Sequence, residues 1–208
     1  MSQSRPTTPR PRLWRLSATY GTVLGGLAFV AAVFWFQDLR YALPTPRPVD
    51  LRAPDLGARV SAEELAQLGL PSRRPLFLHF ASDDCPCSRF VVAHLRELAR
   101  NQPRVHFLVV NEGPGGDPLE LGLPELDDRD GRLAARLGVY ATPQAVLLDA
   151  QGRIYYRGNY QSARYCTDPA SEYARLALED LAAGRGARDW PAAALVSYGC
   201  ALPGERGK

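Results

Sequence analysis

Two cysteines separated by a single proline, Cys85-Pro86-Cys87, are the residues of this sequence best suited to chemistry. They follow a short apolar run, Leu76–Phe80, and precede residues with helical spacing. A thiol at the start of a helix meets unpaired backbone N–H groups, which favour the thiolate, and the thiolate is the attacking form. We therefore expect Cys85 to be the exposed nucleophile. Cys87 falls on the buried stripe of the helix, where it would be shielded and would act as the resolving thiol.

The chain around these cysteines alternates between strand and helix patterns, which predicts one α/β domain with a central mixed sheet flanked by helices. A capping box of Ser61 and Glu64 opens the domain with a short helix. Strands are predicted by four apolar runs, 76–80, 105–110, 145–149 and 153–156. Helical spacing predicts helices from Cys87 to about Arg100, from Asp130 to Leu137 and from Asp168 to Gly184. The stretch Asn111–Arg129 is rich in loop signals. The last two strands flank Ala150-Gln151-Gly152, a hairpin signal.

A second motif, Thr142-Pro143, stands directly before the predicted strand 145–149. With Cys85-Pro86-Cys87 upstream, the sequence here resembles the thioredoxin superfamily, in particular the membrane-anchored TlpA-like and related bacterial proteins, over about residues 58–183. The resemblance implies a thioredoxin-like fold and a thiol–disulfide oxidoreductase that requires no metal or organic cofactor. It also implies a cis Thr142–Pro143 bond that faces the cysteines and positions an extended thiol substrate.

The sequence departs from the thioredoxin pattern around the cysteines. One residue separates them in place of two, and Asp83-Asp84 replaces the usual tryptophan. Two acids beside a thiolate oppose its formation, so the direction of electron flow stays open. His79 lies near the place where thioredoxins bury a proton-relaying acid. It is a candidate base for Cys87, and the alternative is a strand histidine without a catalytic role.

Two further cysteines, Cys166 and Cys200, lie outside this pattern. In an oxidising compartment we expect them to form a structural disulfide that ties the C-terminal segment to the loop before the last helix. The alternative is a pair of buried thiols that are not joined.

The N-terminal part of the chain predicts a membrane anchor. A basic tail, residues 1–15, carries four arginines, and residues 16–36 contain no charge. About 20 apolar residues cross a bilayer core, and a cleavable signal peptide usually has a shorter apolar run. A proline-rich tether, residues 37–57, would then hold the thioredoxin-like domain, residues 58–203, off the bilayer. We expect a single-pass protein of the inner (cytoplasmic) membrane with its domain on the periplasmic side.

The net charge of the chain argues against nucleic acid as its partner. The net charge is +3, and four of the positive charges are the arginines of the tail, which leaves −1 on the remaining residues. Such a body does not provide the basic surface that nucleic acid requires. We expect a cysteine-containing client protein and a thiol/disulfide electron-donor protein as partners.

A Cu(I) chaperone on the same fold is the alternative function, since thiolates are soft ligands and His79, His94 and His106 are nearby candidates. A peroxidase is less favoured, because Leu78 stands where the peroxidase pattern requires proline. A zinc site is also less favoured, because the sequence offers no second cysteine pair with ligand spacing.

Overall fold

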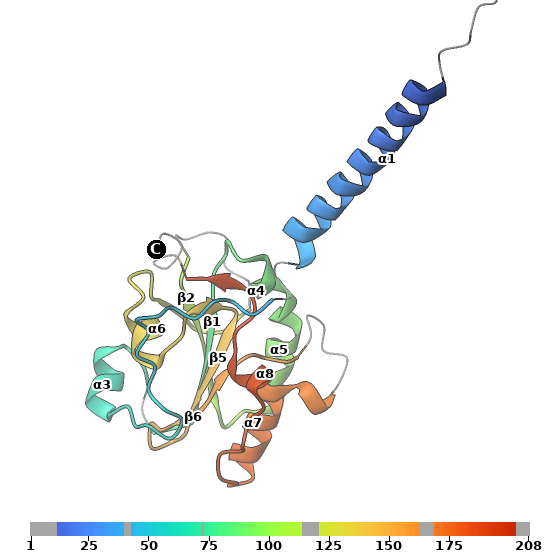
Figure 1. Cartoon of the computed structure of the whole chain (residues 1–208). Helices are drawn as coiled ribbons and strands as arrows, with labels where there is room; N and C mark the ends of the chain where they lie inside the picture. Colours follow the sequence, from blue (N-terminus) through green and yellow to red (C-terminus); the bar gives the residue numbers. More distant parts are fainter. Residues whose placement is uncertain (1–11, 40–42, 72, 114–120, 163–168, 203–208) are drawn as a thin grey trace, which may run out of the picture. The chain divides into compact units, whose positions relative to one another are not determined.

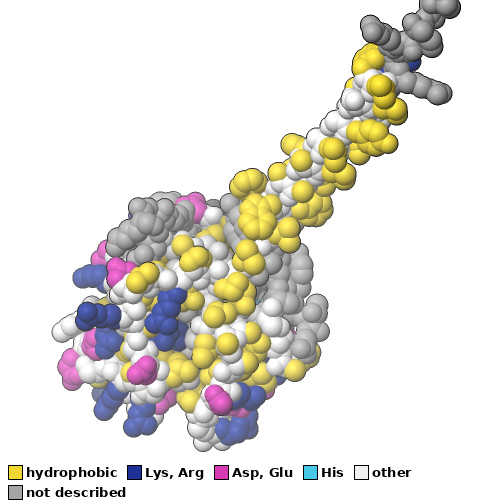
Figure 2. Space-filling model, viewed as in Figure 1, with side chains coloured by type: hydrophobic (Ala, Val, Ile, Leu, Met, Phe, Trp, Pro, Cys, Tyr) yellow, Lys and Arg dark blue, Asp and Glu magenta, His cyan; other side chains and the backbone are white. Residues whose placement is uncertain are grey.

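The computed structural model describes residues 12–39, 43–71, 73–113, 121–162 and 169–202 (Figure 1). The chain divides into two compact units, Met1–Arg40 and Tyr41–Lys208. The first unit contains helix α1 (Arg12–Phe34), which continues into the π-helical turn η1 (Trp35–Leu39). Figure 2 shows hydrophobic side chains along α1. Residues 13–37 are long and apolar enough to cross a membrane, a property that anchors and signal sequences share.

The second unit is built on a five-stranded sheet with the strand order β3-β2-β1-β5-β6. Its strands are β1 (Leu76–Ala81), β2 (His106–Asn111), β3 (Glu125–Asp127), β5 (Gln144–Leu148) and β6 (Ile154–Gly158). The first three run parallel, and β5 and β6 are antiparallel to their neighbours. A short sheet of β4 (Ala141–Thr142) and β7 (Cys200–Ala201) lies beside it.

Helices cover both faces of the sheet. They are α3 (Ala62–Gln67), α4 (Pro86–Phe90), α5 (Val92–Asn101), α6 (Arg132–Leu137), η2 (Pro169–Ser171), α7 (Tyr173–Ala182) and α8 (Ala192–Leu195). One core packs α5 and α7 against Phe77 and Phe107, and the other packs α3 and α6 against Leu78 and Phe80. Alternate residues of β1 therefore face opposite cores, which is the consequence of the strand's period of two. Parallel strands followed by an antiparallel hairpin, with helices on both faces, make this a thioredoxin-like fold, as the sequence predicts.

The local signals act mostly as expected. Ser61 caps α3, and its hydroxyl accepts the Glu64 N–H at 3.1 Å. The helix expected to begin at Asp130 begins at Arg132 instead, and Asp130 accepts the Arg132 N–H at 3.4 Å. The carboxylate of Asp128 accepts the next two N–H groups, those of Leu133 and Ala134, at 2.9 and 2.8 Å. Asp128 is buried, so its charge is stabilised by the two N–H groups that would otherwise lack a partner at the helix start.

Two stretches differ from the sequence prediction. The stretch expected to be a loop, Asn111–Arg129, contains β3, which pairs with β2 through only three residues and includes a single apolar residue, Leu126. The helix after the cysteines is interrupted at Val91, so that α4 and α5 are separate. The start of the last helix, Asp168, lies outside the described residues, and α7 begins at Tyr173.

Residues 43–57 of the expected tether pack on the domain instead of standing away from it. These residues form no regular helix or strand, as their prolines favour. However, Thr45 N–H donates to Ser197 O at 2.8 Å, and Arg157 donates to Pro54 O at 2.7 Å. Backbone N–H and carbonyl groups of the segment thus find hydrogen-bond partners on the domain.

Candidate active site

Cys85 stands at the junction between β1 and α4. Its N–H donates to Ser82 O at 2.9 Å, and its carbonyl accepts the Ser88 N–H at 3.0 Å. Cys85 is the N-terminal cap residue of α4 and has extended backbone angles, while Pro86 takes the first helical position, where no N–H is needed. The tight turn after the buried strand fixes the sulfur at the end of the sheet.

The sulfur of Cys85 forms a disulfide with Cys200, 115 residues further along the chain. The two Cα atoms are 5.8 Å apart, within the usual range for a disulfide. Strand β7 brings Cys200 there, since it pairs antiparallel with β4 so that Cys200 lies opposite Thr142. The candidate site is thus assembled from the two ends of the domain.

The peptide bond between Thr142 and Pro143 is cis, as the family resemblance implies. The Thr142 carbonyl oxygen lies 3.1 Å from Cys85 Sγ. In the disulfide this sulfur has no proton to donate, but in the thiol form the same geometry allows an S–H···O hydrogen bond. The Thr142–Pro143 bond therefore does face the cysteine at the start of α4.

The burial of the two motif cysteines is the reverse of the sequence prediction. Cys85 is fully buried and Cys87 is half-buried. The interruption at Val91 changes the phase of the helix, so that Ser88 occupies the buried position expected for Cys87. Cys85 is buried because Cys200 and Thr142 contact its sulfur.

The expected Cys166–Cys200 disulfide is also wrong, because Cys200 is joined to Cys85. Cys166 itself lies outside the described residues. Cys200 is in a disulfide, as expected, but its partner is Cys85, the candidate nucleophile, and not the cysteine nearest to it in sequence.

His79 is buried within β1, and its Nδ1 lies 2.8 Å from the Tyr160 hydroxyl. Burial lowers the pKa of His79 to about 3, so the imidazole is neutral at physiological pH. His94 packs edge-on against the same Tyr160 ring at 6.2 Å, and burial lowers its pKa as well. This arrangement favours the structural alternative for His79, a histidine held by tyrosine, over a relay that carries a proton to Cys87.

Glu112 is a buried carboxyl that the sequence did not single out. It follows β2, and its N–H donates to Ala81 O at 2.9 Å, which places it at the same end of the sheet as the cysteines. Burial, together with hydrogen bonding to Asp128, raises the pKa of Glu112 to about 9. This carboxyl is therefore protonated and uncharged at neutral pH.

Metal ligation is not favoured by the arrangement of the candidate ligands. Within the described ranges, no three His, Cys, Asp or Glu side chains gather closely enough to hold a metal ion. His106 is half-buried on β2, His79 is engaged with Tyr160, and Cys85 is a disulfide sulfur without a free thiolate. The copper alternative gains no support from this geometry.

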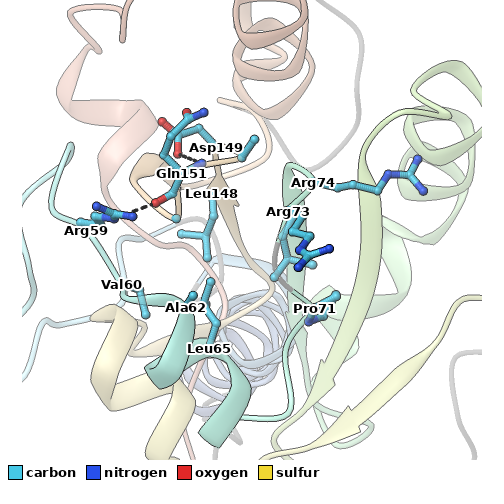
Figure 3. A pocket seen from close by; sticks show the side chains of 13 residues that line it. Arg59, Val60, Ala62, Leu65, Pro71, Arg73, Arg74, Leu148, Asp149 and Gln151 are labelled. Carbon is cyan, nitrogen blue, oxygen red and sulfur yellow. Dashed lines mark hydrogen bonds between the residues drawn. The ribbon is translucent and has the colours of Figure 1, made fainter.

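A pocket of about 270 Å³ lies at the opposite end of the sheet, where β1 begins and β5 ends (Figure 3). Arg59, Arg73 and Arg74 line it together with Asp149. Arg59 Nε donates to Gln151 O at 3.0 Å, as the figure shows. The pocket contains no residue of the Cys85 site.

The sequence motifs point to Cys85 and to the cis Thr142–Pro143 bond, but no motif identifies Cys200 as the disulfide partner of Cys85. No local pattern marks the two residues of β7 as a strand, because the pairing with β4 is long-range. The one available signal was Gly199 directly before Cys200. A glycine beside a reactive cysteine suggests a close backbone approach.

Comparisons with known proteins agree with the fold. The family described as "Domain of unknown function (DUF6436)" matches residues 57–201. A hypothetical protein from Sinorhizobium meliloti 1021 has a similar structure at 21% identity, with a TM-score of 0.55 over 73% of this chain and 95% of the other. An uncharacterized conserved protein from Geobacillus kaustophilus gives 20% identity and a TM-score of 0.56 over 77% of this chain and 97% of the other.

Proposed function

We propose that this chain, which belongs to the DUF6436 family, is a membrane-anchored thiol–disulfide oxidoreductase with Cys85 as its nucleophile. One observation carries the proposal: Cys85 Sγ is in a disulfide and lies 3.1 Å from the carbonyl of the residue before cis-Pro143. A buried structural disulfide requires neither a strand-to-helix junction nor a second cysteine two residues away. Both are present here.

The exchange reaction proceeds through a mixed disulfide. With the protein reduced, the Cys85 thiolate attacks one sulfur of a client disulfide, a bond forms between the two proteins, and the second client sulfur leaves as a thiolate that takes up a proton. A second thiol of this chain then loses its proton and attacks Cys85 Sγ. The client leaves with two thiols, the chain keeps a disulfide, and two electrons have passed to the client; the reverse sequence oxidises a client dithiol.

The chain's partners in this proposal are a cysteine-containing client and a thiol or disulfide protein that restores the starting state. Backbone at Thr142 would pair with the extended client segment beside Cys85. Glu112, held protonated at the same end of the sheet, is available as a proton donor for the leaving thiolate.

An extracytoplasmic location follows from the same proposal. The apolar helix at residues 13–37 would anchor the chain in the inner membrane, and the four arginines within residues 1–15 favour a cytoplasmic N-terminus. A disulfide such as Cys85–Cys200 persists in oxidising compartments. A reporter that is active only outside the cytoplasm, fused after Lys208, should be active; activity only of a cytoplasmic reporter would overturn the orientation.

The activity test uses the full-length chain in non-ionic detergent, a peptide with one disulfide as client and dithiothreitol as the electron source. We expect Cys85→Ser to lower the rate above background by at least about a hundredfold, because the attacking atom is removed. Cys166→Ser is the matched control and should keep the full rate. A Cys85→Ser protein as active as the wild type would refute the proposal.

A further inference from the structure

Strand β7 makes with the rest of the domain the contacts that an extended client would need. Its Cys200 lies opposite Thr142 and its Ala201 opposite Ala141, and the Cys200 sulfur is bonded to Cys85. Main-chain pairing does not depend on side-chain identity, and the disulfide requires only a cysteine. Any peptide with an extended cysteine could make both contacts, but not while β7 occupies the edge of β4.

We propose that β7 is a built-in occupant of the client position and that Cys200, in place of Cys87, is the resolving cysteine. This inference rests on the proposed function and names the second thiol of the exchange. The Cys85–Cys200 disulfide is then the oxidised end state of the catalytic cycle.

The approach of β7 is shaped for close contact. A Cβ atom at Gly199 would lie 2.1 Å from Thr142 O and 3.2 Å from Pro143 Cδ, and Gly199 has a φ of +149°. Both the backbone conformation and the space therefore require glycine. Only with glycine there does the segment come near enough for Cys200 to reach Cys85.

Several hydrogen bonds guide the segment into place. Thr45 N–H donates to Ser197 O at 2.8 Å, and the Thr45 hydroxyl donates to Gly199 O at 3.2 Å. On the other side, Ser197 N–H donates to the Tyr140 hydroxyl at 3.0 Å. Leu202 N–H donates to Tyr140 O at 3.2 Å. The segment therefore returns to one defined position.

The part of the chain that precedes β7 is fixed to the core of the domain. Trp190 is buried, and its ring packs against Tyr156 at 4.8 Å. Ala194 O accepts the Asn159 N–H at 2.8 Å and the Tyr156 hydroxyl at 3.0 Å. Only a few residues separate this fixed part of the chain from Cys200. Cys200 therefore stays near Cys85 after the disulfide is broken, and its attack on Cys85 is intramolecular.

Docking of β7 also has an energetic cost. In the described part of the structure, the hydroxyls of Thr142 and Ser197 are buried without hydrogen-bond partners. Exposure to water on undocking would restore their hydrogen bonds. The contacts that hold β7 are therefore partly offset, and a client strand can replace it.

In the resolving step, Cys200 displaces the client sulfur from Cys85. After the client mixed disulfide has formed at Cys85, the Cys200 thiol gives up its proton and its sulfur attacks Cys85 Sγ. The Cys85–client bond breaks, the Cys85–Cys200 bond forms, and the client sulfur leaves as a thiolate that takes up a proton. A dithiol protein or dithiothreitol later reduces Cys85–Cys200 and is itself oxidised to a disulfide.

The test follows the mixed disulfide in a single turnover. Fully reduced full-length protein in detergent is mixed with the disulfide peptide, quenched with N-ethylmaleimide at intervals and separated without reductant. We expect the mixed disulfide to live at least about tenfold longer in Cys200→Ser than in the wild type. In Cys87→Ser we expect the same lifetime as in the wild type. Accumulation in Cys87→Ser with rapid resolution in Cys200→Ser would overturn the inference and leave the proposed function intact. Absence of any Cys85-dependent mixed disulfide would remove both.

A second variant tests docking while all thiols are kept. Gly199→Ala should lengthen the mixed-disulfide lifetime as Cys200→Ser does, because β7 can no longer approach Thr142. Gly186→Ala is the matched control, since a Cβ there meets nothing within 4 Å. Resolution at the wild-type rate in Gly199→Ala would show that β7 docking is not part of the step.

Discussion

The two ends of the central sheet carry polar and charged groups of very different connectivity. At one end, Cys85, Thr142 and Cys200 are brought together across 115 residues and are held by a disulfide and by strand pairing. At the other end, Arg59 and Arg73 line an open pocket, where Arg59 donates to the backbone carbonyl of Gln151 in a turn. The candidate active site is therefore distinguished by residues far apart in the sequence that meet at one reactive atom. Charge or a pocket alone does not distinguish it.

The largest effect on stability should come from breaking the convergent end. A cross-link between residues 115 apart restricts the unfolded chain strongly, so its loss should lower the free energy of unfolding by about 5 kcal/mol on the chain-entropy model. Urea unfolding of Cys200→Ser in detergent measures this loss, with Cys166→Ser as the control. An unchanged midpoint in Cys200→Ser would mean that the disulfide does not constrain the folded protein.

The next effect concerns Glu112, the buried carboxyl at the same end. Its pKa is raised to about 9, so the folded state holds a proton that the unfolded state releases above its ordinary pKa of 4.5. The stability contributed by this proton is present below pH 4.5 and is lost as the pH rises toward 9. Between pH 5.5 and 8, Glu112→Gln should remove a decline of about 3 kcal/mol. Parallel stability–pH curves for the two proteins would contradict the burial of this group.

His79, in the middle of the sheet, should give a smaller effect of opposite sign. Its pKa is lowered to about 3, so the unfolded state binds a proton below its ordinary pKa of 6.5 while the folded state does not. Stability is therefore complete above pH 6.5 and falls as the pH decreases toward 3. His79→Gln should flatten this fall by about 2 kcal/mol between pH 6.5 and 5. The decisive quantity is the slope, since losing the Tyr160 contact changes the absolute stability as well.

The smallest effect is expected at the open end. Arg74 donates to Pro103 O and Arg104 O at the surface, and exposed contacts of this kind contribute little. Arg73→Gln and Arg74→Gln should each change stability by less than about 0.5 kcal/mol and leave the peptide-reduction rate unchanged. A large loss of activity in either variant would show that the two ends are coupled.

The sequence predicted those parts of the molecule that local patterns determine. Apolar runs located β1, β2, β5 and β6, and the capping box located α3, because burial and capping act over a few residues. Short motifs indicated the candidate nucleophile, Cys85, and the strand with the cis Thr142–Pro143 bond. The C-terminal partner was not found, because β7 is two residues long and its position depends on β4.

The same limit explains the reversed burial of the motif cysteines. A continuous helix would have placed Cys87 on the buried stripe, but the interruption at Val91 gives that place to Ser88. Covering of Cys85 by Cys200 is a tertiary effect that helical spacing cannot reveal. The family resemblance supplied the conformation of Thr142–Pro143, which composition and periodicity do not encode.

The central claim, that Cys85 and Cys200 form the redox couple, is tested most directly by mapping the disulfide of the full-length chain isolated from membranes with its thiols blocked at lysis. Trypsin leaves Cys85 and Cys87 on one peptide, because Arg89 follows both, and places Cys200 on another. We expect these two peptides to be joined by a disulfide that fragmentation assigns to Cys85, and we expect dithiothreitol to release both peptides. A Cys85–Cys87 bond closed within one peptide, or a Cys166–Cys200 bond, as the sole oxidised form would contradict the central claim.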